Sequence, residues 1–270
     1  MFALVENGLL LFISSKGIRN KARFAGYLLL NVLNRLNFFK LKGRNFKLTF
    51  NGITFWVGLS SAELGSYIEI FIKNVYDLTS DFIAGEGDVV IDIGSNIGLY
   101  AIKQANRAGI GGKIWSFEPN PLSFERLTMN LEENSIKNVK TFKKAVSSKA
   151  GSVKFSVNFG MTVEGKLFHP GETTVSDKDT IIEVECVTLD DFVVENNIEK
   201  IDILKIDTEG EELEVLRGAS NNALPVTEKI VMEYHGEERR QSVSRFLKEK
   251  NFSAVLEDEK NRILYFKRGF

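Results

Sequence analysis

Three acidic residues and one histidine are the candidate functional residues of this sequence. Each lies at the end of an apolar run. They are Asp92, Glu118, Asp207 and His235. Parallel strands end at one edge of a sheet, and ligands of such sheets bind outside that edge. We therefore expect one cleft to collect all four residues. There a carboxylate can accept hydrogen bonds from ligand hydroxyls, and a histidine, with an ordinary pKa of about 6.5, can take up a proton.

The segment from Val89 to Gly98 indicates which ligand the cleft would hold. An apolar run that ends in Asp92 and turns through two glycines is typical of a buried strand that leads into a helix N-terminus. Dinucleotide-binding loops need a middle glycine beside the pyrophosphate, but Asn96 stands there, and no Gly-Lys-Ser/Thr phosphate loop follows. With Glu118 placed to bind ribose hydroxyls, the pattern predicts an adenosine site without a pyrophosphate seat.

Alternating strand and helix signals would position these residues. Apolar runs predict five parallel strands, at 89–93, 113–117, 139–146, 201–206 and 229–234. Helices are expected between them; Asn120 and Pro121, for instance, suit the cap and first residue of one. A closing hairpin, Phe252–Leu256 with Arg262–Phe266, would complete the sheet. We expect an α/β fold with a doubly wound, Rossmann-like, seven-stranded and mostly parallel sheet.

Charge divides the chain near residue 62. Residues 1–62 carry nine Lys or Arg and one acid, Glu6, whereas the remainder carries 26 basic and 35 acidic residues. A basic segment of this kind favours an anionic membrane surface or a lipid-linked phosphorylated substrate. Docking on the acidic remainder of the chain, or on a second subunit in a homodimer, is the alternative.

Two elements are expected within this basic segment. Phe24–Phe39 has apolar residues at helical spacing, with Val32 among them, and Phe46–Val57 alternates about an Asn-Gly pair, a strong hairpin signal. The sequence thus predicts a helix and hairpin extension over residues 1–62 and a main domain over residues 63–270.

Composition narrows the cellular setting. A single cysteine, Cys186, excludes an intramolecular disulfide and a multi-cysteine metal site, which favours a reducing compartment. Apolar runs stay below the roughly 18 residues of a spanning helix, and Met1–Ile13 lacks the basic start of a signal peptide. We expect a soluble cytoplasmic protein that at most lies peripherally on the inner membrane surface.

Five short blocks carry a family resemblance: Val90–Gly98, Phe117–Asn120, Val187–Asp191, Leu204–Gly210 and Glu233–His235. Through them residues 63–235 resemble the FkbM-type methyltransferases. The order Lys-Ile-Asp-x-Glu-Gly in the fourth block is the most selective feature, and Ser95 replaces the family's usual alanine. The resemblance implies a class I fold and S-adenosylmethionine-dependent methyl transfer to a hydroxyl of a sugar, glycan or related natural product.

The resemblance and the residue types together assign roles. His235 is the expected general base, with Asp207 or Glu209 as its orienter or alternate. No metal is assigned, although these groups could bind a divalent cation, and buried Lys205 should pair with a nearby acid. The expected cofactor-binding residues are Asp92, Gly94, Ser95, Asn96, Gly98, Glu118, Pro119, Asn120, Ala145, Val146 and Asp207.

Two other functions compete with this hypothesis. A nucleic-acid methyltransferase could use the basic extension to hold phosphates, but the aromatic-proline tetrapeptide expected after the fourth strand is missing. A non-catalytic adenosine-ligand or scaffold protein would keep the fold without turnover. The segment Asn158–Thr180, which contains His169, is expected to be an exposed loop or a substrate lid.

Overall fold

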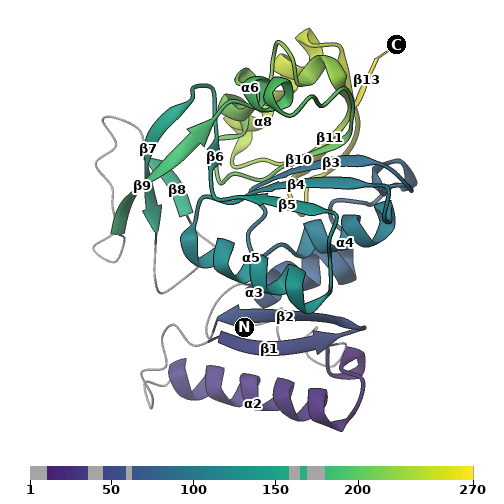
Figure 1. Ribbon diagram of the computed structural model, residues 1–270, viewed down its shortest axis with the longest axis vertical. Coiled ribbons are helices and arrows are strands. Elements are labelled where there is room, and N and C mark those ends of the chain that lie inside the picture. The colour runs from purple at the N-terminus through teal and green to yellow at the C-terminus, as the bar shows by residue number, and fades with distance from the viewer. Residues whose placement is uncertain (1–10, 36–44, 59–62, 158–164, 169–179, 270) are drawn as a thin grey trace.

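The computed structural model (Figure 1) describes residues 11–35, 45–58, 63–157, 165–168 and 180–269. Its centre is a seven-stranded sheet of order β12-β13-β11-β10-β3-β4-β5. The strands are β3 (Val89–Ile93), β4 (Lys113–Phe117), β5 (Val139–Phe142), β10 (Ile201–Ile206), β11 (Thr227–Glu233), β12 (Phe252–Asp258) and β13 (Ile263–Arg268). The first five are parallel, and β13 runs antiparallel between β11 and β12. The predicted doubly wound α/β sheet is confirmed.

Helices cover both faces of this sheet because side chains alternate along each strand. Val90 of β3 joins the apolar cluster on one face, and Ile91 joins the cluster on the other. Figure 1 shows α4 and α5 below the sheet and α6 and α8 above it. The helix bounds are α4 (Leu99–Ala108), α5 (Pro121–Glu133), α6 (Leu189–Glu195), α7 (Glu212–Arg217) and α8 (Glu237–Glu249).

The N-terminal elements form further layers below α5 (Figure 1). The hairpin β1 (Asn45–Phe50) and β2 (Ile53–Gly58) confirms the expected turn at Asn51 and Gly52. Helix α2 (Ile18–Arg35) lies under the hairpin, and α3 (Glu63–Tyr67) and a π-helical segment η1 (Ile68–Lys73) follow the hairpin in the chain. Short 3-10 turns occur at η2 (Ser80–Phe82) and, in the α/β part, at η3 (Leu224–Val226). Within the described residues, no helix is long and apolar enough to span a membrane.

The hairpin is joined to the α/β part by apolar and polar contacts. One apolar cluster runs from Phe24 through Phe50 and Tyr67 to Tyr100. Asn130 of α5, which is fully buried, accepts a hydrogen bond from the Trp56 backbone at 2.7 Å. The predicted domain boundary at residue 62 falls in segment 59–62, outside the described residues, and stays a prediction.

Helix α2 departs from the sequence prediction in its start and in its inward face. It begins at Ile18 rather than Phe24, and Val32, which the sequence places on the same apolar face as Phe24, is 54% exposed. Phe24 and Tyr27 are the buried residues, stacked edge-on against Phe50 and Phe46 of the hairpin. The helix has one apolar face that is buried and another that is exposed. The predicted periodic pattern combined residues of both faces, Phe24 from the first and Val32 from the second.

The predicted strand 139–146 is wrong as one element. The chain leaves the central sheet after β5 at Phe142, and after Lys143 and Lys144 it pairs with another strand as β6 (Ala145–Val146). Exposed Lys143 lies at this break. A second sheet of order β6-β9-β7-β8 results, completed by β7 (Gly151–Val157), β8 (Gly165–Phe168) and β9 (Thr180–Val187). The proposed lid, with His169, falls mostly outside the described residues.

Candidate active site

The turn after β3 is shaped by two glycines at positive φ. Gly94 has φ +76°, and a Cβ there would lie 1.7 Å from the carbonyl oxygen of Asp207. The Asp207 N–H in turn donates to Ile93 at 3.0 Å, so the ends of β3 and β10 are pressed together. Gly98, with φ +82°, is the N-cap residue of α4 and lies close to Leu127. Only glycine allows both the backbone angle and the close approach at Gly94.

Glu118, directly after β4, holds this turn through its carboxylate. One oxygen accepts from the Asn96 N–H and the other from the Asn120 N–H, both at 2.8 Å. Burial raises the pKa of Glu118 to about 7, although both N–H groups oppose that shift. Each carboxylate oxygen retains a second lone pair. The residue can therefore clamp the turn and still accept a ligand hydroxyl.

Lys205 of β10 ties the turn to the strands beneath it. Its ammonium lies 3.1 Å from the Asp92 carboxylate and 3.6 Å from Asp207, and it donates to the Gly94 carbonyl at 2.7 Å. Burial alone would lower the lysine pKa, but the charges of Asp92 and Asp207 raise it above its usual value. The expected pairing of Lys205 with an acid is confirmed, and the negative charge of Asp92 is balanced by this ion pair.

A cavity of about 320 Å³ opens above the turn. Among its lining residues are ten predicted at the site: Gly94, Ser95, Asn96, Glu118, Pro119, Asn120, Ala145, Val146, Asp207 and Glu209. Three others lie outside its wall. Asp92 is fully buried beside Lys205, Gly98 is the N-cap residue of α4, and His235 lines a second, wider cavity of about 1350 Å³. Leu167 and Glu211 border both cavities.

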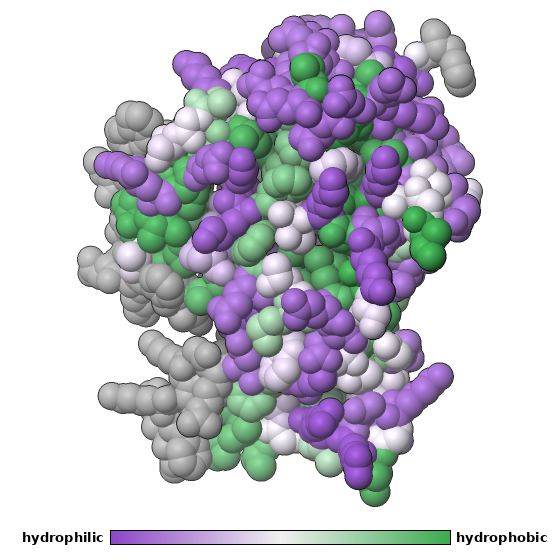
Figure 2. Space-filling model, viewed as in Figure 1, coloured by the Kyte–Doolittle hydropathy of each residue, from purple (hydrophilic) through white to green (hydrophobic). Residues whose placement is uncertain are grey.

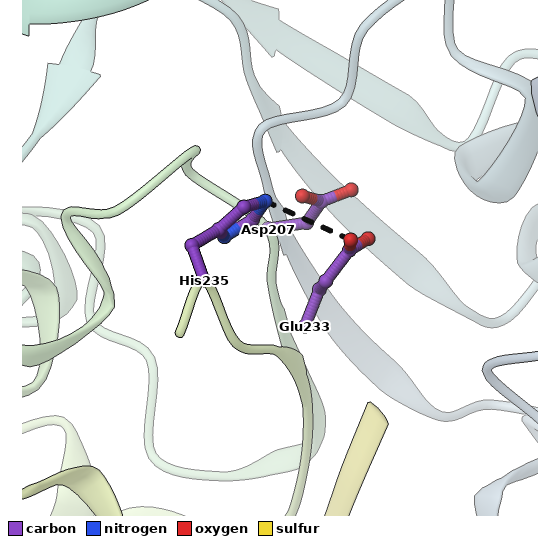
Figure 3. A group of neighbouring side chains, drawn as sticks. All are labelled: Asp207, Glu233 and His235. Atoms are coloured by element: carbon purple, nitrogen blue, oxygen red, sulfur yellow. Dashed lines mark ion pairs between the residues drawn. The ribbon is translucent and has the colours of Figure 1, made fainter. Parts of the chain in front are cut away.

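His235 is surrounded by the carboxylates of Asp207, Glu209, Glu212 and Glu233, which together are called the carboxylate nest here. Asp207 and Glu233 are drawn with His235 in Figure 3. Its Nδ1 is 2.9 Å from Glu212, which is fully buried, and its Nε2 is 3.1 Å from Glu209 and 3.6 Å from Glu233. Figure 3 shows the imidazole ring facing the Asp207 and Glu233 side chains. These groups come from the ends of β10, α7 and β11. The expectation of one cleft is not met: Glu118 and Asp207 line the first cavity and His235 the second, while Asp92 is buried beside Lys205.

The carboxylates change the protonation of this nest. Burial by itself lowers the pKa of His235, but its hydrogen bonds to Glu209 and Glu212 outweigh that and raise the pKa to about 10. Burial and the neighbouring Asp207 charge raise the pKa of Glu233 to about 8, against the opposing effect of His235. At neutral pH the imidazole is therefore cationic, and a cationic imidazole has no lone pair with which to accept a proton.

A divalent cation is the other species this nest could hold. Asp207, Glu233 and His235 each offer one ligand atom, and these atoms lie within 4.8 Å of one another. Carboxylate oxygens and imidazole nitrogens are common ligands of such ions. Binding would have to displace the proton of His235, which the carboxylates hold tightly.

Several residues of the site were missed or left without a role by sequence reasoning. Tyr76 donates its hydroxyl hydrogen bond to Asp207 at 2.9 Å, and Glu212 anchors His235. Segment 65–70, across α3 and η1, supplies a cavity wall. Glu233 and Glu212 were visible only as ordinary acids, since neither local spacing nor periodicity shows which distant groups they meet.

Relatives of this chain include several methyltransferases. The model of the methyltransferase FkbM domain matches residues 92–257. A hexuronic acid methyltransferase from Haloferax volcanii is 31% identical over 64% of this chain and 66% of its own length. The 31-O-demethyl-FK506 methyltransferase FkbM of Streptomyces tacrolimicus is 30% identical over 63% of this chain and 73% of its own.

Solved methyltransferase structures match this chain at low sequence identity. A putative methyltransferase from Streptococcus mutans in complex with SAH has a TM-score of 0.46 and 12% identity, over 73% of this chain and 97% of that one. A match this remote says nothing about the site.

The sheet order and the turn from Gly94 to Gly98, called the ligand turn here, define a class I, Rossmann-like methyltransferase. The chain belongs to the FkbM methyltransferase family, and its cofactor is S-adenosylmethionine. The cavity fits that group. Asn96 Oδ1 and Thr208 Oγ1 are buried in its wall without a partner among the described residues, and both could bond to the ligand. Carboxylates beside them suit the ammonium and sulfonium groups of this cofactor, which also carries one carboxylate of its own.

Proposed function

We propose that the protein methylates a hydroxyl oxygen of a sugar, a glycan or a related natural product. The main support for this proposal is that the two cavities adjoin at the carboxylate nest. Asp207 and Glu233 border the cofactor cavity, while His235 borders the wider one. Walls of the wider cavity carry hydroxyl groups and charges of both signs, from Ser147, Ser148, Lys149, Ser152, Lys154, Glu214, Glu237, Glu238, Arg239 and Ser242.

Such walls suit a polyhydroxylated acceptor, which needs many hydrogen-bond partners of both kinds. Two relatives agree with this class, since one is a hexuronic acid methyltransferase and the other a 31-O-demethyl-FK506 methyltransferase. Cytoplasmic location and a homodimer stay predictions from the sequence.

In the proposed reaction the cofactor supplies an electrophilic methyl group on sulfur. The chain's own contribution is to align the acceptor oxygen with that carbon and to take its proton, so that the new C–O bond forms as the C–S bond breaks. Alignment supplies much of the rate, and a positioned base adds about 10²–10⁴-fold.

We infer that Glu233 is the base and that His235 is a positioning residue. A pKa of about 8 makes the Glu233 carboxylate a stronger base than an ordinary one, and it faces the cofactor cavity. Asp207 already accepts from Tyr76 and lies near Lys205, which fixes its orientation. The imidazolium of His235 would hold Glu209, Glu212 and Glu233 in place.

The direct test is transfer of labelled methyl groups to fractionated cell extract. We expect the labelled methyl group in a glycan or small-molecule pool. Glycosidase or mild acid treatment of that pool should release labelled fragments. Label found in RNA would favour the nucleic-acid alternative. No transfer to any pool, together with normal cofactor binding, would favour a non-catalytic protein. A parallel assay with EDTA separates the metal alternative, because the proposed mechanism keeps its rate under chelation.

A further inference from the structure

Helix α2 presents an apolar stripe to solvent on the side away from the protein. Residues spaced by four and three fall on one face of a helix, and the stripe consists of Ile18, Ala22, Ala25, Leu29 and Val32. Ile18 is 86% exposed, Leu29 60% and Val32 54%. Phe12 and Ile13, just before the helix, are also exposed. Contiguous apolar surface of this kind marks a docking surface more often than chance.

Basic side chains border the stripe on both sides. A rotation of about 100° per residue places Arg19 beside one edge and Lys21 beside the other, with Arg23, also exposed, farther round the helix. The Lys21 ammonium also lies 5.0 Å from the ring centroid of Phe12. Between Glu6 and Glu63 the sequence has no acidic residue at all. The charge around the stripe is therefore entirely positive.

The opposite face of the helix is already occupied. Phe24 and Tyr27 are buried against the hairpin, and the Tyr27 hydroxyl donates to the Gly58 carbonyl at 3.4 Å. Figure 1 shows the hairpin between α2 and the α/β part. Figure 2 shows hydrophobic and hydrophilic residues side by side at the same outer end of the molecule. The stripe faces outward, so docking on the acidic main domain of the same molecule does not cover it.

We propose that this face of α2 binds an anionic lipid surface, with the helix lying in the plane of the membrane. Such helices bury an apolar face about 5–10 Å into the headgroup boundary while flanking cations contact acidic headgroups. A helix of 18 residues is about 27 Å long, which suits this in-plane position. A second copy fits less well, because Arg19 and Lys21 of both copies would border the same seam.

Vesicle sedimentation of the full chain tests this surface. Low-salt binding to phosphatidylcholine vesicles containing phosphatidylglycerol is expected, with little binding to phosphatidylcholine alone. In about 1 M salt, where the Debye length is about 3 Å, binding should largely disappear. Arg19→Gln with Lys21→Gln, one from each side of the stripe, should weaken partitioning about thirtyfold, since each interfacial cation contributes about 1 kcal/mol.

Matched variants separate the two parts of the surface. Leu29→Ser with Val32→Ser should also reduce binding at least about tenfold, because it removes apolar area at unchanged charge. Arg245→Gln with Lys248→Gln, two exposed positions on α8, and Ile110→Ser, a fully exposed apolar residue, should leave binding unchanged. Melting temperature and S-adenosylmethionine affinity should stay near wild type in every variant, which shows that the fold is intact.

Three outcomes would overturn the proposal. One is no binding to anionic vesicles at low salt. Another is binding that the α2 variants and the control variants reduce equally. The third is a dimer, seen by light scattering, that Leu29→Ser with Val32→Ser dissociates, because the occupant would then be a second copy. Arg35, Lys40, Lys42 and Arg44, also predicted to contact a membrane, lie outside the residues whose side chains are described and are not needed for the test.

Discussion

The chemistry of single residues in this site depends on which charges surround them. His235 has the ordinary ring of a general base, but two carboxylates raise its pKa to about 10. Glu233 is an ordinary acid in the sequence, and burial beside Asp207 raises its pKa to about 8. Acid and base roles follow from such environments rather than from residue type.

The pH dependence of turnover should distinguish these two residues. If Glu233 is the base, it must be ionised, so kcat should rise with pH and level off above about 8. Glu233→Gln should lower kcat about 10²–10⁴-fold. His235→Asn removes a cation that lowers the pKa of Glu233, so the inflection should move to higher pH while part of the turnover survives.

Glu249→Gln, at an exposed position on α8 that borders neither cavity, is the matched control and should keep the wild-type profile. A wild-type kcat that rises through about pH 10, together with loss of all turnover in His235→Asn, would instead make His235 the base.

Cofactor affinity should depend on the charge of Glu118. Hydroxyl groups of the ligand favour the ionised carboxylate, so affinity should increase with pH up to about 7 and change little above. Glu118→Gln should weaken binding by about 1.5–3 kcal/mol, the value of a hydrogen bond to a charged group, and flatten the pH dependence. Titration calorimetry measures both.

Glu125→Gln, exposed on α5, should leave affinity as it is. Unchanged affinity in Glu118→Gln would remove Glu118 from ligand binding and leave it only the turn. Without ligand the sign reverses: the folded protein holds this proton more tightly than the unfolded chain, so the group's contribution to stability falls as pH rises from 4.5 to about 7.

At the scale of elements, α5 connects the N-terminal hairpin to the ligand turn. The Asn130 side chain accepts from the Trp56 N–H on β2 at 2.7 Å and donates to the Ile97 carbonyl at 2.8 Å, beside the turn. Glu63 and Arg126 form a buried ion pair at the same junction, where Glu63 also accepts from the Gly58 N–H at 2.6 Å. The extension is therefore packed into the fold.

Asn130→Ala should lower the free energy of unfolding by about 2–4 kcal/mol, because it leaves a buried N–H and a buried carbonyl without partners. Denaturant unfolding measures this loss, with Asn222→Ala, an exposed position, as the control. A change below about 0.5 kcal/mol would mean that the hairpin and α5 separate without cost.

At the scale of the whole molecule, ligand binding should stabilise the folded state. S-adenosylmethionine at about 100 times its Kd adds about 2.7 kcal/mol, which raises Tm by roughly 5–10 °C for a chain of this size. NAD should leave Tm unchanged, since the turn has Asn96 where a dinucleotide loop needs glycine. Differential scanning calorimetry decides this, and a rise with NAD alone would contradict the site.

Local patterns determined the sheet, the hairpin and the ligand turn. Apolar runs and glycine spacing depend on neighbours in sequence, so β3, β4, β10 and β11 and the turn at Gly94 could be predicted from residues alone. Motif resemblance added the family and the cofactor. These features are local because backbone conformation and burial pattern repeat over a few residues.

Tertiary structure alone decided what the charged residues do. Asp92 of β3 forms an ion pair with Lys205 of the neighbouring strand β10. Glu212 forms a hydrogen bond with His235, which is 23 residues away in the sequence. It also decided that Val32 faces solvent, because burial of Phe24 and Tyr27 against the hairpin turned the other apolar face of α2 outward. Protonation and exposure depend on distant groups that come together only on folding, and no local pattern encodes that arrangement.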